Sequence, residues 1–147
     1  MALSTSKIIS ERSDERGFCI FCKIAKGEIP CTKVYEDNDY LAFLDIKPLN
    51  KGHTLVIPKK HFQWVYDVDD QSGYWTVAKK MANSIVKNLN AEYVMFVTWG
   101  LEVPHAHIHV IPRHNQKDDP GFIDWKNVKQ ISQEEMKQIA EKIAIKK

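Results

Sequence analysis

Three histidines alternate with apolar residues in the segment His105-Ala-His-Ile-His-Val-Ile111, and this pattern constrains the fold more than any other in the chain. Side chains of a β-strand point alternately to its two faces. A strand over His105–Ile111 therefore directs the imidazoles of His105, His107 and His109 to one face and the apolar side chains to the other. The apolar set fits a hydrophobic core, so we expect the imidazoles to line an outer surface or a cleft. Same-face neighbours in a strand lie roughly 7 Å apart, so one phosphate-sized group can touch two of the rings.

The rest of the chain predicts short strands mixed with a few helices. Its 147 residues, 44% of them hydrophobic, fit one compact domain with its own core. The strands follow one another too closely for repeated crossovers, so we expect an α+β fold with a roughly five-stranded antiparallel sheet and two to three helices. The expected first helix is Cys19–Lys26, and the expected strands are Lys33–Glu36, Tyr40–Asp45, His53–Ile57, Tyr93–Thr98 and His105–Ile111.

Two longer helices are expected in the second half of the chain. The first begins near Asp69 or Asp70, because either side chain can cap its first turn. A final helix follows Ser132-x-x-Glu135, whose spacing resembles a capping box. Apolar residues at steps of three and four predict the core face of the long helix, namely Trp75, Ala78, Ala82, Ile85 and Leu89.

The charge balance and the first residues bear on partners and location. The net charge is only +2, from 21 basic and 19 acidic residues, so we expect neither nucleic acid nor a membrane surface as a partner. No run approaches the roughly 20 apolar residues of a membrane span. Residues 1–17 lack the apolar middle of a secretory signal. We expect a flexible N-terminal arm over 1–17 and a cytoplasmic protein.

The alternating histidines allow three interpretations. They can be solvated strand residues, although three of the six histidines at alternate positions are unexpected by chance. They can bind a metal, since imidazole is a common zinc ligand. They can also carry phosphate chemistry, in which a neutral imidazole attacks phosphorus and a second donates hydrogen bonds to the oxygens. Under this third interpretation, His53 is a candidate orienting partner for the nucleophile.

The spacing Cys19-x-x-Cys22 also leaves alternatives open. It fits a redox pair, half of a zinc site or two structural cysteines. A structural zinc needs about four ligands, and His61 with one of the alternating histidines can complete the set. Cys31 is expected to be structural.

Five segments in the same order resemble the histidine triad (HIT) family of nucleotide-binding proteins. The resemblance covers most of the chain, and it implies a compact antiparallel α+β fold that pairs as a homodimer. It also implies attack on the α-phosphate of a nucleotide and a nucleotidyl-histidine that water then hydrolyses. The matching segments are Phe18–Ile24, Gly27–Pro30, Tyr40–Ile46, Lys51–His61 and His105–Arg113.

The resemblance assigns roles residue by residue. It implies that His107 is the nucleophile, that His109 contacts the phosphate oxygens and that His53 is the fourth histidine of the active site. Asp45 matches the residue that binds the ribose hydroxyls, and Thr98 takes the place of an asparagine. A structural zinc ion is implied as cofactor. The implied base pocket is Ile20, Phe21, Ile24, Phe43 and Ile46, and the implied zinc ligands are Cys19, Cys22, His61 and His105.

The segment before the triad departs from the family pattern. Residues 97–104 form a loop several residues shorter than usual, and Glu102 stands where a small hydroxyl donor is expected. Glu102 can point to solvent, act on a leaving amine or mark an altered choice of substrate. The expected division of the chain is an arm at 1–17, a HIT core at 18–113, and a tail at 114–147 that includes a turn at 118–121 and the final helix.

The expected activity is hydrolysis of nucleoside phosphoramidates or similar purine nucleotide conjugates. The related uridylyltransferases have a glutamine at the position of His109. Because this chain has a histidine there, the resemblance favours hydrolysis over transfer. One alternative is a dinucleoside polyphosphate hydrolase. Another is a nucleotide-binding regulatory module with little turnover, and a third is a redox protein built on Cys19 and Cys22.

Overall fold

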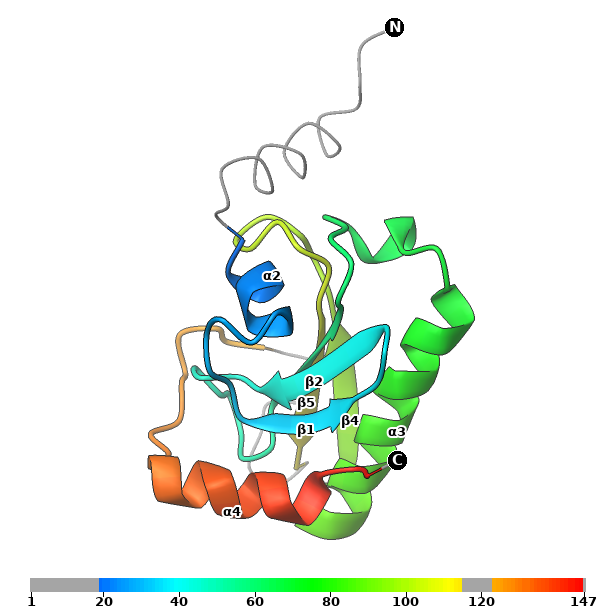
Figure 1. The fold of residues 1–147 in the computed structure, drawn as a ribbon. Coiled ribbons are helices and arrows are strands. Elements are labelled where there is room, and N and C mark those ends of the chain that lie inside the picture. The colour runs from blue at the N-terminus through cyan, green and yellow to red at the C-terminus, as the bar shows by residue number, and fades with distance from the viewer. Residues whose placement is uncertain (1–18, 115–122, 147) are drawn as a thin grey trace, which may run out of the picture.

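The computed structural model describes residues 19–114 and 123–146 (Figure 1). The expected arm at 1–17 and the expected turn at 118–121 lie outside the described residues. Within the described part of the chain, no helix combines the length and the apolar character needed to span a bilayer.

The described residues form one five-stranded sheet in the order β1-β2-β3-β5-β4, with every neighbouring pair antiparallel. This confirms the α+β class and the expected sheet. The strand β5 lies inside the sheet, because His109 is opposite Leu55 of β3 on one side and Val97 of β4 on the other. The strands are β1 (Lys33–Glu36), β2 (Tyr40–Leu44), β3 (Thr54–Pro58), β4 (Tyr93–Val97) and β5 (Ile108–Arg113).

The strand that was expected over His105–Ile111 begins three residues late, at Ile108. The backbone before Ile108 makes its hydrogen bonds to residues outside the neighbouring strands. The N–H of His105 donates to the carbonyl of Val103 at 2.8 Å, and the N–H of Ala106 donates to the carbonyl of Phe62 at 2.5 Å. Only His109 of the three histidines therefore lies in a strand. The strand prediction was wrong for His105 and His107.

Three α-helices and one 3-10 turn complete the described fold: α2 (Ile20–Ala25), η1 (Val65–Asp67), α3 (Gln71–Leu89) and α4 (Gln133–Ile143). Asp70 caps α3 through a hydrogen bond from the N–H of Gly73 at 2.9 Å. Ser132 caps α4 by accepting from the N–H of Glu135 at 3.1 Å. Both caps agree with the sequence. The expected core position of Trp75 is wrong, because Trp75 is 37% exposed and its neighbour Tyr74 is buried instead.

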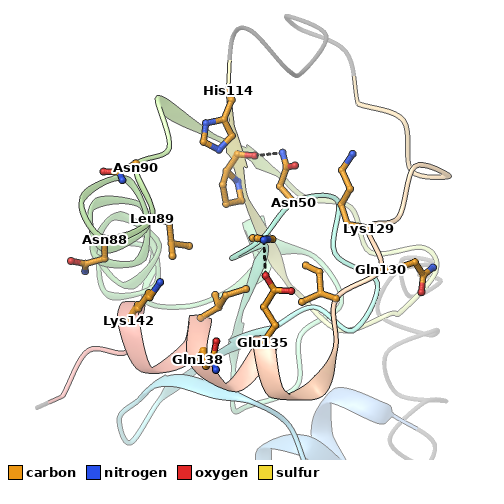
Figure 2. Close-up of a pocket in the computed structure, with 14 residues that line it drawn as sticks. Asn50, Asn88, Leu89, Asn90, His114, Lys129, Gln130, Glu135, Gln138 and Lys142 are labelled. Carbon is orange, nitrogen blue, oxygen red and sulfur yellow. Dashed lines mark hydrogen bonds and ion pairs between the residues drawn. The ribbon is translucent and has the colours of Figure 1, made fainter.

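The sheet separates two hydrophobic clusters. The main core lies between the sheet and the helices α3 and α4, and the second core lies under the short helix α2 on the other face (Figure 1). Strand β2 feeds both, since Ala42 and Leu44 enter the main core while Leu41 and Phe43 enter the second. At the edge of the main core, a cavity of about 620 Å³ opens between the end of α3, the helix α4 and the loop before β3 (Figure 2).

Candidate active site and metal cluster

The three triad histidines lie on the face of the second core. Ala106, Ile108 and Val110 belong to the main core. The rings of His105 and His107 meet the ring of Phe21 edge-on, with centroids 5.8 and 5.2 Å apart. The expected alternation of faces therefore holds even where the strand does not. The histidines are 0%, 5% and 7% exposed in chain order, which excludes the interpretation as solvated residues.

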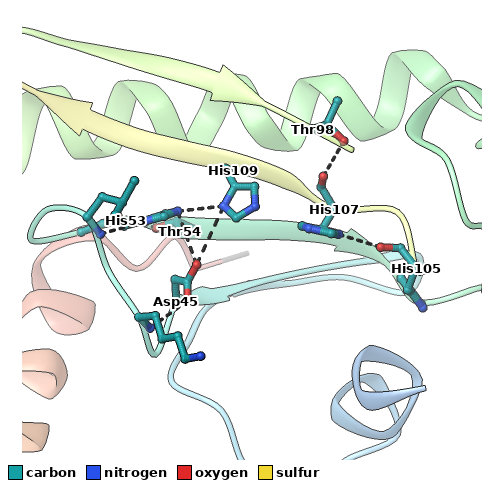
Figure 3. A network of polar contacts seen from close by, with 10 residues as sticks. Asp45, His53, Thr54, Thr98, His105, His107 and His109 are labelled. Atoms are coloured by element: carbon teal, nitrogen blue, oxygen red, sulfur yellow. Dashed lines mark hydrogen bonds and ion pairs between the residues drawn. The ribbon is translucent and has the colours of Figure 1, made fainter. Parts of the chain in front are cut away.

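The hydrogen bonds of His107 fix which of its ring nitrogens carries a proton. Nδ1 lies 2.7 Å from the carbonyl oxygen of His105 (Figure 3). A carbonyl can only accept, so Nδ1 carries the hydrogen and Nε2 of the neutral ring keeps a lone pair. Burial lowers the pKa of His107 below its usual value, which favours this neutral form. The backbone of His107 is also held in place, because the hydroxyl of Thr98 donates to the carbonyl of His107 at 2.6 Å.

His53 and His109 form a second fixed pair. The N–H of Leu49 donates to Nδ1 of His53 at 3.0 Å, so the proton of a neutral His53 sits on Nε2. That Nε2 lies 2.9 Å from Nδ1 of His109, which must then accept (Figure 3). The remaining nitrogen of His109, Nε2, therefore carries a hydrogen and is a donor. Burial lowers the pKa of His53 to about 3, and burial with the neighbouring His53 and His107 lowers that of His109 to about 2.

Asp45 lies beside this pair at the end of β2. Its Oδ2 is 3.5 Å from Nε2 of His53 and 3.8 Å from Nδ1 of His109, and its Oδ1 accepts from the N–H of Lys47 at 2.9 Å. Burial raises the pKa of Asp45. Although the three side chains are close enough to hold an ion, the proton on Nε2 of His53 occupies the position that a metal would need. The two imidazoles are therefore joined by a hydrogen bond, with the Asp45 carboxylate beside them.

Two tryptophans that the sequence analysis did not select enclose His109. Trp99 stacks on the ring of His109 at 5.5 Å and 21°. Trp125 meets the same ring edge-on at 4.9 Å and meets Trp99 at 4.7 Å. The segment that carries Trp125 is held against the loop between β2 and β3, because the N–H of Lys129 donates to the carbonyl of Pro48 at 2.7 Å. No spacing rule predicts the contact of Trp125 with His109, since it depends on the path that the tail takes.

The residues expected to bind the base divide into two groups. Phe21, Ile24 and Phe43 lie together in the second core and are buried. Ile20 and Ile46 are 44% and 80% exposed, so the structure does not bring them into that cluster. Glu102 is also exposed, and its charge raises the pKa of His107 slightly against the larger effect of burial.

Cys19, Cys22, His61 and His105 converge in one cluster, with all four donor atoms within 4.8 Å of one another. Sγ of Cys19 is 3.2 Å from Nδ1 of His105, and Sγ of Cys22 is 3.2 Å from Nδ1 of His61 and 3.5 Å from Nδ1 of His105. A tetrahedral zinc with bonds of about 2.3 Å to sulfur and 2.0–2.1 Å to nitrogen places such donors roughly 3.5 Å apart. The donor set therefore fits zinc in type, number and spacing.

The surroundings also prepare the cluster for a cation. Nε2 of His105 lies 2.8 Å from the carbonyl of Pro58, which places the hydrogen on Nε2 and leaves the lone pair of Nδ1 facing the two sulfurs. The hydrogen bond from the Cys22 side chain is the largest cause that holds the pKa of the Cys19 thiol well below its usual range, as a metal-binding thiolate requires. Both ring nitrogens of His105 are therefore engaged, Nδ1 with the sulfurs of the cluster and Nε2 with the carbonyl of Pro58. The His105 ring is thus not available to act together with His107 and His109.

The comparisons with known proteins agree with this geometry. The HIT domain model matches residues 26–116. Adenosine 5'-monophosphoramidase hnt1 of Schizosaccharomyces pombe is 40% identical over 131 residues, which cover 87% of this chain and 97% of that protein. Adenylylsulfatase HINT3 of Arabidopsis thaliana is 36% identical over 110 residues, or 70% of this chain and 56% of that protein.

A solved structure adds the metal to the comparison. The crystal structure of a zinc-bound histidine triad family protein from Mycobacterium smegmatis superposes with a TM-score of 0.68 at 29% identity, covering 85% of this chain and 92% of that one. Sequence match, fold and the placement of the triad on one face of the sheet converge on one conclusion: the chain belongs to the HIT domain family.

Proposed function

We propose that this protein hydrolyses nucleoside 5'-phosphoramidates, and related purine nucleotide conjugates, by attack of His107 on the α-phosphate. One observation carries the proposal: the hydrogen bond from Nδ1 of His107 to the carbonyl of His105 leaves Nε2 as a fixed lone pair. The adjacent ring of His109, at a centroid distance of 5.0 Å, presents an N–H donor. A nucleophile beside a donor is the pairing that phosphoryl transfer requires.

The reaction proceeds in two displacements. Nε2 of His107 forms a bond to phosphorus, the bond from phosphorus to the leaving nitrogen breaks, and the amine takes a proton from water. Water then attacks phosphorus, the bond to Nε2 breaks, and the attacking water loses a proton to solvent. The phosphorylated imidazole is cationic while Nδ1 keeps its hydrogen, and the carbonyl of His105 stabilises that charge.

The remaining polar groups orient the substrate. His109 donates from Nε2 to a phosphate oxygen, and His53 holds it in that tautomer as a positioning residue. Asp45 accepts hydrogen bonds from the ribose hydroxyls through a carboxylate at the rim of the same cluster. The base lies against the apolar side chains of the second core next to α2. The purine preference is taken from the relatives whose names specify adenosine or adenylyl substrates.

The leaving group is the least constrained part of the substrate. The two named relatives act on conjugates with nitrogen or sulfate attached to the nucleotide, so one attack on phosphorus supports several leaving groups. Phosphorus NMR of the protein incubated with adenosine 5'-phosphoramidate and a diadenosine polyphosphate tests the assignment. Release of AMP from the phosphoramidate alone supports the proposal. Cleavage of the dinucleotide alone replaces it with a polyphosphate hydrolase, and no turnover of either replaces it with a binding module.

We also propose that Cys19, Cys22, His61 and His105 hold a structural zinc ion. When bound, zinc supplies a crosslink between α2, the end of β3 and the segment that precedes β5. The fit of the four donors supports this role over a redox pair. Thiol labelling of the purified protein distinguishes the two, because bound zinc protects both thiols until a chelator is added, whereas a redox pair reacts without one.

The resemblance to the family implies a homodimer, and we propose that it forms across the edge strand β4. This strand ends the sheet, and its Phe96 is 44% exposed. Trp75 of α3 packs edge-on against Phe96 at 5.8 Å, which extends the apolar surface beyond the strand. Sedimentation tests the proposal: the chain should run at twice 17.0 kDa and Phe96→Glu at 17.0 kDa. A wild-type chain at the monomer mass contradicts it.

A further inference from the structure

The cavity beside α4 is lined by side chains that the proposed function does not use. The cavity of about 620 Å³ lies between the last turn of α3, the helix α4 and the loop that precedes β3 (Figure 2). This volume is in the range of small-molecule pockets. None of the residues that line it belongs to the triad, to the group formed by Asp45 and His53 or to the cysteine cluster.

The charges around the cavity favour an anion. Three lysines line it against one glutamate: Lys51, Lys129 and Lys142 against Glu135. Glu135 already pairs with Lys51 at 2.6 Å. Lys129 and Lys142 form no ion pair with a residue of the described chain, and Figure 2 shows them on different walls. Two cations are therefore left to meet an anionic group.

The other lining residues favour hydroxyl groups and a small apolar surface. Side chains that carry an amide line the cavity, namely Asn50, Asn88, Asn90, Gln130 and Gln138, and an amide has both donor hydrogens and an acceptor oxygen. Nδ2 of Asn50 already donates to the carbonyl of Pro112 at 2.7 Å, and Nδ2 of Asn88 donates to the hydroxyl of Ser84 at 3.1 Å. The last turn of α3 ends here in Asn90, which adopts a left-handed conformation at φ 56°. Carbonyls at a helix C-terminus have no partner within the helix and can accept from hydroxyls. Leu89, Pro112 and Ile139 supply an apolar floor.

From this combination we infer that the cavity binds a small phosphorylated molecule rich in hydroxyl groups. The two unpaired lysines take the phosphate, and the amides with the end of α3 take the hydroxyls. This binding site is separate from the proposed hydrolytic site and does not depend on that activity. The two sites share the loop before β3. Asn50 and Lys51 line the cavity, and the preceding residue, Leu49, donates the N–H that fixes the tautomer of His53.

Ribose 5-phosphate is a suitable probe, because it carries a phosphate and several hydroxyls on a compact frame. It is titrated into the isotope-labelled, zinc-loaded full chain while backbone amide shifts are followed by NMR. We expect saturable shifts at Asn88, Asn90 and Lys129, with weaker effects from ribose or inorganic phosphate alone. Amide shifts separate this site from the catalytic one, where Asp45 and His107 report. Shifts confined to the catalytic residues overturn the inference.

Charge variants sharpen the test. Lys129→Gln combined with Lys142→Gln should weaken binding roughly tenfold, because two exposed charge contacts are lost. Glu135→Gln releases Lys51 to the ligand and should tighten binding about threefold. A gain in affinity is a result that structural damage does not produce. Lys137→Gln, on the same helix but outside the cavity, is the matched control. Equal affinity in the double variant and in Lys137→Gln contradicts the inference.

Discussion

The two faces of the sheet differ in what they bury. The face toward α3 and α4 buries a large and almost wholly hydrophobic core. The face toward α2 buries a smaller apolar cluster together with four imidazoles, those of His53, His105, His107 and His109. A buried polar group costs free energy unless it is hydrogen-bonded. Each of these rings has a partner, and each partner selects one tautomer. One face therefore stabilises the fold, and the other holds fixed chemical groups.

The first prediction removes the nucleophile from the chemical face. His107→Ala should lower hydrolysis of adenosine 5'-phosphoramidate by at least about 10⁴-fold, because the covalent route is lost. Nucleotide affinity should change little, which titration with AMP can measure, and calorimetry checks that the variant is folded at the assay temperature. Residual hydrolysis within tenfold of the wild type would remove His107 from the mechanism.

The second prediction removes the metal from the same face. Chelation of zinc should lower stability by about 4 kcal/mol if the ion is present at a thousand times its dissociation constant. For a chain of this length that is a drop on the order of 10 °C in Tm. Cys19→Ser should abolish the response to zinc, while Cys31→Ser, outside the cluster, should keep it. A Tm that does not respond to chelator or zinc contradicts the structural role.

The third prediction concerns the opposite face. Ile85 of α3 is fully buried in the main core, so Ile85→Ala should cost about 2–5 kcal/mol of unfolding free energy. Activity of the folded fraction should stay within a few fold, since no catalytic group touches Ile85. Denaturant unfolding and assays at low temperature measure the two effects. Lys79→Ala, exposed on the same helix, serves as the control. A large loss of activity in folded Ile85→Ala would contradict the claim that one face of the sheet provides stability and the other provides the chemistry.

The fourth prediction follows from the lowered pKa of His107. Attack requires the neutral ring, so activity is lost as pH falls through the pKa of this group in the free enzyme. Because burial lowers that pKa, the acidic limb of kcat/KM should lie below pH 6.5, the approximate value for an unperturbed histidine. A limb at or above 6.5 contradicts the buried neutral state. Glu102→Gln should move the limb slightly lower, because the charge of Glu102 raises this pKa.

Local pattern was enough to predict much of this arrangement. The bounds of β1, the caps Asp70 and Ser132 and the alternation of faces around the triad depend on neighbouring residues, and all were predicted correctly. The start of β5 was not, because a long-range bond between Ala106 and Phe62 diverts the backbone. Trp75 and Tyr74 are both apolar neighbours on α3, and periodicity alone selected the wrong one. The contact of Trp125 with His109 depends on the path of the tail, which no local pattern specifies.

The smallest expected effect concerns the support behind the nucleophile. Thr98→Val removes the hydrogen bond to the carbonyl of His107 and should cost about 1 kcal/mol of stability. A shift in the position of His107 should lower kcat a few fold while KM changes little. Thr98→Ser keeps the hydroxyl and should restore both values. If Thr98→Ser behaves like Thr98→Val, the hydroxyl has no positioning role.

The central claim is that His107 forms a bond to phosphorus during turnover, and the stereochemical course at phosphorus tests it most directly. A nucleoside phosphoramidate made chiral at the α-phosphorus with sulfur and oxygen isotopes is hydrolysed in isotopically labelled water. Each in-line displacement inverts phosphorus, so two displacements through His107 predict overall retention. Overall inversion would show a single direct attack by water and would contradict the account.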